Sequence, residues 1–166
     1  MKHNLITLTI DHKTVEVPEG TTILAAAKSV GISIPTLCYL NLSDFGCVNT
    51  PSSCRMCLVE VEGRRNLAPA CVTPASDKMT VSTNSVRALK TRKTMLELLL
   101  SDHPKDCLTC QKSGNCELQS LADKFSIRDI KLKGEQSAYR LDISKSLIRD
   151  MDKCIMCRRC ETMCNE

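Results

Sequence analysis

The cysteines constrain this chain more than any other feature, because eleven of the twelve fall into three groups with the spacings of metal ligands. Each group contains at least one pair of cysteines separated by only two residues, and further candidate ligands lie nearby. Such spacing lets neighbouring sulfur atoms bind one metal centre through a short loop. The groups are Cys38, Cys54, Cys57 and Cys71; His103, Cys107, Cys110 and Cys116; and Cys154, Cys157, Cys160 and Cys164.

Twelve cysteines could instead form disulfides, so the redox compartment has to be considered. The apolar run from Leu5 to Ile10 is too short and too polar for the core of a signal peptide, and no small-residue cleavage site follows it. No stretch reaches the ~18 apolar residues of a membrane span. We therefore expect a cytoplasmic protein with reduced thiols and no membrane span, in which metal binding is the leading use of the cysteines.

The composition also favours a cofactor that supports the fold. The 166 residues include two Tyr, two Phe and no Trp, which excludes a large aromatic core. The chain has room for one ordinary domain or two to three small ones. Small domains bury too little apolar surface to be stable without additional cross-links. Metal ligation supplies such links. We expect the chain without its cofactors to be poorly folded.

The net charge of +4 suggests a mildly basic protein, but it omits the cofactors. Four thiolates around a 2Fe-2S core bring that unit to about minus two. The basic residues of the middle region lie among helical hydrophobic positions or in a turn, and the aromatic platforms of single-strand binders are missing. We expect a solvated basic face and no nucleic-acid partner. These residues are Arg64, Arg65, Arg87, Lys90, Arg92 and Lys93.

The first eighty residues alternate strand and helix signals. Apolar residues alternate with polar ones over 6–10 and again over 15–17, which predicts a β-hairpin. A helix capped by Thr21 or Thr22 follows and ends at Gly31. Strands are predicted at 58–62 and 79–82. This order is that of a β-grasp ferredoxin domain, which we place at residues 1–83 of an α+β protein.

Two smaller units follow. Thr83 and Asn84 are predicted to cap a helix that ends at Ser101, with Pro104 preventing its continuation. A short helix opens at 115–116, so residues 84–125 form a small helical unit. Residues 126–166 comprise a weakly patterned linker, centred on 134–137, and the last cysteine run. The apolar positions of the two helices are Val86, Leu89, Leu96, Leu99 and Leu100, then Leu118, Leu121, Ala122 and Phe125.

The first cysteine group suits a 2Fe-2S cluster. The pair Cys54 and Cys57 can reach one iron, and Cys38 and Cys71 complete a set of four thiolates. Four thiolates would also suit zinc, so that alternative stays open. Fifteen residues separate Cys38 from Cys54, more than the four of plant-type ferredoxins. Cys47 lies in this long loop, where we interpret it as a free thiol in an irregular insertion.

The second group combines one imidazole with three thiolates, which either zinc or a 4Fe-4S cluster could accept. A neutral imidazole in place of a thiolate removes one negative charge and should raise the potential of a cluster. His103 lies four residues before a Cys-x-x-Cys pair and is restrained by Pro104. We therefore expect it to be a ligand together with Cys107, Cys110 and Cys116.

The third group has the most specific spacing. The run from Cys154 to Cys164 has the bacterial ferredoxin pattern, in which the fourth cysteine ligates the other cluster of a two-cluster fold. Cys154, Cys157 and Cys160 are therefore expected to hold one 4Fe-4S cluster, and Cys164 to belong to another. The remaining ligands are not in these residues. One or two further 4Fe-4S clusters would form only if those ligands were supplied.

With these motifs in this order, the chain resembles the N-terminal iron-sulfur region of multi-cluster FeFe hydrogenases, and above all those of NAD(P)-linked, electron-bifurcating complexes. The large iron-sulfur subunit of complex I and the alpha subunit of NAD-dependent formate dehydrogenases share this region. The resemblance covers the whole chain. It is carried by 34–39, 54–63, 66–71, the motif from His103 to Cys116, and 148–165.

The resemblance implies an electron-relay module of a larger oxidoreductase, with no catalytic centre of its own in these residues. It would carry electrons between a flavin-containing subunit that oxidises NAD(P)H and a hydrogen-activating site beyond residue 166. A small thioredoxin-like 2Fe-2S subunit is the other implied partner. The alternatives are the same module in formate dehydrogenase or complex I, and a zinc-stabilised interaction module that transfers no electrons.

Overall fold

The computed structural model describes residues 4–134, 141–146 and 148–165 as a mixed α/β chain. The predicted hairpin is confirmed: β1 (Leu5–Ile10) and β2 (Lys13–Pro18) pair antiparallel. Alternation along β2 places Val15 and Val17 in the core and leaves the residues between them exposed. Hairpin β1–β2 therefore presents one apolar face.

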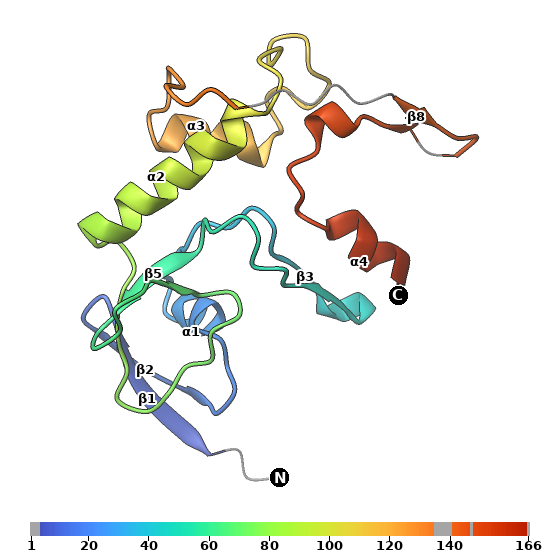
Figure 1. The fold of residues 1–166 in the computed structure, drawn as a ribbon. Helices are drawn as coiled ribbons and strands as arrows, with labels where there is room; N and C mark the ends of the chain where they lie inside the picture. The colour runs from blue at the N-terminus through green and yellow to red at the C-terminus, as the bar shows by residue number, and fades with distance from the viewer. Residues whose placement is uncertain (1–3, 135–140, 147, 166) are drawn as a thin grey trace.

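Helix α1 (Ile23–Ser29) covers that face (Figure 1). Its N-cap is Thr22, whose hydroxyl accepts a hydrogen bond from the Ala25 amide at 3.2 Å. Gly31 follows the helix at φ +74°, a left-handed conformation that favours glycine, as predicted. Ile23, Ala26 and Ala27 are buried against the strands. The small alanines let the helix approach the sheet closely.

The sheet is completed by strands far along the chain, in the order β2-β1-β7-β5-β6. Strand β7 (Thr80–Ser82) runs parallel to β1, while β5 (Leu58–Val61) runs antiparallel to both β7 and β6 (Ala68–Pro69). The predicted strands at 58–62 and 79–82 are thus confirmed, and β6 is an addition. Because β5 and β6 are neighbours, the segments that precede and follow them also lie together.

The loop between Cys38 and Cys54 is ordered, so the predicted irregular insertion is wrong. Strands β3 (Leu40–Leu42) and β4 (Cys47–Asn49) form a small hairpin around the short helix η1 (Ser43–Phe45). Gly46 closes the turn at φ +73°. Cys47 is buried on β4, at 2% exposed, and its sulfur lies 3.6 Å from that of Met163.

Helix α2 (Val86–Ser101) begins later and faces the core differently than the sequence predicts. Its N-cap is Ser85, not Thr83 or Asn84. Val86 and Leu89, predicted to be core residues, are exposed, whereas Arg92 is 1% exposed. The basic face is therefore only partly solvated. Thr83 instead donates its amide to Asp11 of the β1–β2 turn at 2.7 Å.

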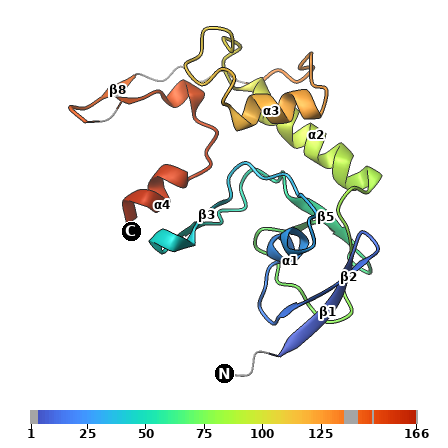
Figure 2. The same cartoon turned by 180° about the vertical axis from the view of Figure 1, so that it is seen from behind.

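The rest of the chain forms a second layer beside the sheet domain (Figures 1 and 2). In both views α2 leads away from the sheet, α3 lies at its far end, and the C-terminal segment returns so that α4 lies beside the β3–β4 hairpin. The elements are α3 (Glu117–Lys124), the hairpin β8 (Asp142–Ile143) and β9 (Ile148–Arg149), η2 (Met151–Lys153) and α4 (Arg159–Asn165).

Two hydrophobic clusters result. The first lies between α1 and the five-stranded sheet, and the second lies where α2, α3 and the cysteine loops meet. Of the predicted linker at 134–137, only Gly134 belongs to the described residues. Within the described part of the chain, no helix is both long and apolar enough to cross a membrane.

Candidate iron-sulfur sites

The four cysteines of the first group are all buried and form two pairs. The sulfurs of Cys57 and Cys71 are 3.3 Å apart. The Cys38 amide donates to the Cys54 sulfur at 3.4 Å, and the two thiols also interact. The spacing indicates that Cys54 and Cys57 can reach one iron. In the structure Cys54 lies beside Cys38, and Cys57 lies beside Cys71.

The backbone explains this pairing. Cys57 immediately precedes β5 and Cys71 follows β6, so the antiparallel pairing of these strands brings the two cysteines together; the Ala70 amide donates to the Cys57 carbonyl at 3.0 Å. Between Cys54 and Cys57, Arg55 has φ +57°. A left-handed residue reverses the chain direction locally, and for a non-glycine it is uncommon and costly. Arg55 therefore marks a sharp local turn between the two cysteines.

Each pair contains one readily ionised thiol. A hydrogen bond from Cys54 lowers the pKa of Cys38 to about 5, and the hydrogen bond with Cys71 lowers the pKa of Cys57 to about 7, against the opposing effect of burial. The same hydrogen bonds, together with burial, raise the pKa of Cys54 and of Cys71. Metal ligands must be thiolates. A cation bound between the pairs would favour the loss of all four protons in this buried site.

The two pairs belong to different hydrophobic clusters. Cys57 and Cys71 are part of the cluster below α1, whereas Cys38 and Cys54 belong to the cluster beneath α2 and α3. A group bound by all four would therefore connect the two cores and be shielded from water on both sides.

Three of the four predicted ligands of the second group line one cavity. His103, Cys110 and Cys116 border a cavity of about 360 Å³, which Leu37 and Leu118 close on the apolar side. Cys107 is exposed and is not among the lining residues. Burial lowers the pKa of His103, which keeps its imidazole neutral at neutral pH, as a metal ligand requires.

The third group spans the loop before α4 and α4 itself, which carries Cys160 and Cys164. Cys154, Cys160 and Cys164 are exposed and Cys157 is partly buried. Met156 and Arg158, on either side of Cys157, have φ of +52° and +59°. The Met156 amide donates to the Cys154 sulfur at 3.4 Å. This loop combines left-handed turns with an amide-to-sulfur hydrogen bond, as the first group does.

One cavity is bordered by a residue from each group. Cys54, His103 and Cys154 line a space of about 230 Å³ beside Leu98 and Leu99 of α2. The three groups are therefore neighbours in space, although 100 residues separate Cys54 from Cys154 in the sequence. Nothing in the spacing of the cysteines predicts this proximity.

Binding of a single metal ion requires several ligands arranged around one point. Among residues 4–134, 141–146 and 148–165, no three or more histidine, cysteine, aspartate or glutamate side chains are arranged to hold one metal ion. A zinc ion needs four ligands at about 2.0–2.3 Å from one point. A cluster distributes its ligands over several irons and therefore accepts sulfurs that are farther apart.

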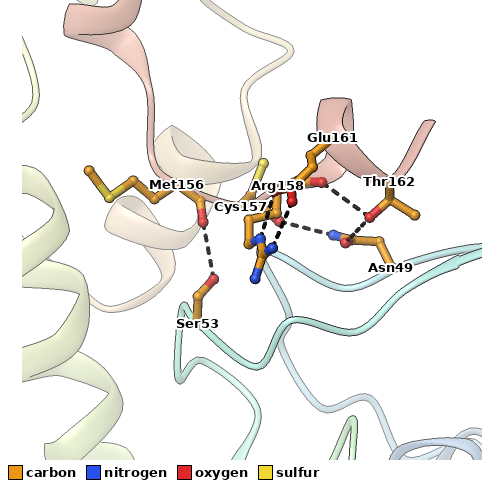
Figure 3. Close-up of polar contacts among 7 residues, drawn as sticks. All are labelled: Asn49, Ser53, Met156, Cys157, Arg158, Glu161 and Thr162. Atoms are coloured by element: carbon orange, nitrogen blue, oxygen red, sulfur yellow. Dashed lines mark hydrogen bonds and ion pairs between the residues drawn. The ribbon is translucent and has the colours of Figure 1, made fainter. Parts of the chain in front are cut away.

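Asn49, which the sequence analysis did not identify, links the first and third groups, and Figure 3 shows its contacts with Cys157 and Thr162. It is 3% exposed. Its side-chain amide donates to the carbonyl oxygens of Cys38 at 2.7 Å and Cys157 at 2.9 Å, and its oxygen accepts from the Thr162 hydroxyl at 2.7 Å. The bond to Cys38 is buried and the other two are partly buried, and the bond from Thr162 fixes which way the amide faces.

Three further contacts support this junction. The Ser53 hydroxyl donates to the Met156 carbonyl at 3.2 Å (Figure 3). Arg159, at the start of α4, donates to the Tyr39 carbonyl at 3.1 Å and pairs with Glu117 of α3 at 2.8 Å. No sequence motif marks these residues, because their partners lie more than 40 positions away.

We expect Asn49→Leu to loosen α4, because it leaves the Cys157 carbonyl without its side-chain donor and the Cys38 carbonyl with only the longer bond from Arg159 Nε at 3.5 Å. Each unsatisfied buried group costs about 1–3 kcal/mol, so opening of α4 should become easier by about 2 kcal/mol and amide exchange over 159–165 about 30-fold faster. Hydrogen exchange measures this. Asn41→Leu, at an exposed position of the same hairpin, is the control and should leave exchange in α4 unchanged.

Comparison with known families agrees with two kinds of cluster site. Residues 3–86 match the family described as 2Fe-2S iron-sulfur cluster binding domain. Residues 92–131 match the NADH-ubiquinone oxidoreductase-G iron-sulfur binding region. Binding regions for a 2Fe-2S cluster and a 4Fe-4S cluster are therefore both present, and the first match includes the four cysteines of the first group.

Similar proteins are subunits of redox complexes. The chain is 66% identical over 163 residues to NADP-reducing hydrogenase subunit HndD of Solidesulfovibrio fructosivorans and 41% identical over 165 residues to an NADH-quinone oxidoreductase subunit of Rhizobium meliloti. Each match covers 98% of this chain but only 28% and 19% of the relative.

A solved structure has the same fold. It is titled an NAD⁺-reducing NiFe-hydrogenase in the H2-reduced state, and it matches with a TM-score of 0.84 and 32% identity over 93% of this chain and 64% of that one.

Proposed function

Since the chain belongs to the family of 2Fe-2S iron-sulfur cluster binding domains, we propose that it is the electron-relay module of an NAD(P)-linked hydrogenase. The relay would consist of a β-grasp 2Fe-2S domain at 1–83, a Cys3His 4Fe-4S domain at 84–125, and a linker with the start of a two-cluster ferredoxin domain at 126–166. The bound clusters supply one-electron chemistry. The residues of the chain hold them, exclude water and fix their separation.

The proposed ligands of the 2Fe-2S cluster are the two buried pairs, Cys38 with Cys54 and Cys57 with Cys71. Support comes from the burial of all four and from the sulfur contact of 3.3 Å within one pair. Each pair would serve one iron. The match of residues 3–86 to a 2Fe-2S cluster binding domain favours the cluster over the zinc-stabilised interaction module.

The proposed ligands of the second cluster are His103, Cys107, Cys110 and Cys116, three of which border the same cavity. Cys107 would have to turn inward when the cluster binds. Cys154, Cys157 and Cys160 would hold a further 4Fe-4S cluster, and Cys164 a second one, with the other ligands supplied from outside these residues.

The observation that carries the relay is the cavity bordered by Cys54, His103 and Cys154, one residue of each group. Electron transfer requires that redox centres lie close together, and a structural role for the metals does not. The buried hydrogen bonds of Asn49 fix the first and third groups to one another. The arrangement therefore favours a chain of centres over isolated structural sites.

The parent enzyme is proposed from the relatives. The 66% identity to a subunit of an NADP-reducing hydrogenase supports hydrogenase, and we propose the FeFe type from the cysteine motifs. The alternative is the same module in complex I, supported by the 41% identity to an NADH-quinone oxidoreductase subunit, or in formate dehydrogenase. The proposed partners are a flavin subunit that oxidises NAD(P)H and a small thioredoxin-like 2Fe-2S subunit, in the cytoplasm.

Iron, zinc and sulfide analysis of the anaerobically purified protein, with EPR spectra during reduction by dithionite, tests the proposal. We expect iron with matching sulfide, a 2Fe-2S signal and at least one 4Fe-4S signal. Zinc without sulfide, and no signal on reduction, would overturn it. Hydrogen-dependent NAD(P) reduction by the whole complex, against formate-dependent reduction, distinguishes the parent enzymes.

A further inference from the structure

Arg92 is a buried cation directly behind the first cysteine group. It lies on α2, is 1% exposed, and is the largest of the fully buried side chains. Its guanidinium donates from Nε at 2.9 Å and from Nη2 at 2.5 Å to the carbonyl oxygen of Leu58. Leu58 follows Cys57 in the chain, so the positive charge lies next to a proposed cluster ligand.

Among the described residues, no carboxylate forms an ion pair with Arg92. The negative groups that favour its charged form are the Cys57 thiolate and, more weakly, Asp11, while burial alone lowers its pKa. An arginine remains charged in proteins, and burying it without a partner is strongly unfavourable.

A purely structural role would not require this charge. A hydrogen bond to one backbone carbonyl needs only a neutral donor, and an apolar side chain would fill the space between α2 and β5 at lower desolvation cost. A negative charge on the other side of the Cys57 backbone would account for a permanent cation at this position. Four thiolates around a 2Fe-2S core provide about two negative charges.

We infer that Arg92 is the buried counter-charge of the 2Fe-2S site and that it raises the reduction potential of the bound cluster. The inference rests on the proposed function of the first cysteine group. Reduction adds one electron, supplied by the reductant, and takes the unit from about minus two to about minus three. A fixed positive charge stabilises the more negative state more strongly, and the low dielectric of the interior increases this effect. Arg92 thus acts on the cluster through its charge and makes no bond to iron.

Redox titration of the 2Fe-2S EPR signal in the cluster-loaded, full-length protein tests this. Arg92→Gln retains a donor for Leu58 and removes the charge, Arg92→Met removes both, and Arg92→Lys retains the charge. We expect Arg92→Gln and Arg92→Met to disfavour reduction by about tenfold or more, a shift of about 59 mV to more negative potential for one electron. Arg92→Lys should stay within about threefold of the unaltered protein.

The matched control is Lys93→Met, which removes one positive charge from the next residue of the same helix at an exposed position. Water screens that charge, so the potential should not change. A 2Fe-2S signal with unchanged potential in both Arg92→Gln and Arg92→Met would overturn the inference, as would an equal shift in Lys93→Met. No 2Fe-2S signal in the unaltered protein would instead overturn the proposed ligand set.

Discussion

Replacement of Cys57 by serine should eliminate the 2Fe-2S EPR signal and reduce iron and sulfide by the content of one cluster. The serine hydroxyl is not ionised at neutral pH, and the remaining sulfur of the pair, Cys71, would lose the neighbour with which it is in contact at 3.3 Å. The clusters of the other groups should remain. Anaerobic EPR and iron analysis give this result directly.

The same substitution should lower the unfolding temperature by at least ~15 °C. A ligand present at 1,000 times its dissociation constant stabilises the folded state by about 4.1 kcal/mol, and each kcal/mol corresponds to about 4–8 °C in a domain of 60–100 residues. The cluster would link two hydrophobic cores that contain few aromatic residues. Loss of the cluster should therefore destabilise both cores, and differential scanning calorimetry would measure the lower unfolding temperature.

Cys47→Ala is the control for Cys57→Ser, because the two cysteines are equally buried at 2% exposed. Cys47 lies on β4 and contacts Met163, away from both sulfur pairs. The alanine variant should lose some packing and retain the full 2Fe-2S signal. Loss of the signal in Cys47→Ala with retention in Cys57→Ser would reverse the assignment of the ligands.

The sequence predicts the parts of the fold that depend on neighbouring residues. Alternation over 6–17 gives the β1–β2 hairpin, and Thr22 and Gly31 bound α1, because strand faces and helix caps are set by local spacing. The candidate ligands follow from spacing as well. These features need no knowledge of the distant chain.

The features that the sequence does not predict depend on contacts between residues that are distant in the chain. The pairing of Cys57 with Cys71 follows from the β5–β6 ladder and from the left-handed Arg55, neither of which the Cys-x-x-Cys spacing reveals. The β3–β4 hairpin has only three residues in each strand, too few to show alternation. Arg92 looks like part of a solvated basic face because burial of a cation requires a partner charge that is remote in sequence.

His103→Cys should retain the second cluster and make its reduction harder. A thiolate in place of a neutral imidazole adds one negative charge to the unit, and the more negative unit accepts an electron less readily. We expect a shift of at least about tenfold in the reduction equilibrium, or about 59 mV. His103→Ala removes a ligand and should reduce the 4Fe-4S content. EPR-monitored redox titration measures the first effect, and iron analysis measures the second.

The two substitutions together separate ligation from packing. His103 borders the cavities shared with Cys54 and with Cys110, so an alanine alone could act by loosening their walls. Only a ligand gives a cluster that is lost with alanine and restored at lower potential with cysteine. His12→Ala, at an exposed turn of the sheet domain, should change neither quantity. Retention of the cluster at unchanged potential in both His103 variants would mean that the fourth ligand is another residue, while the three thiolates of the group could still be correct.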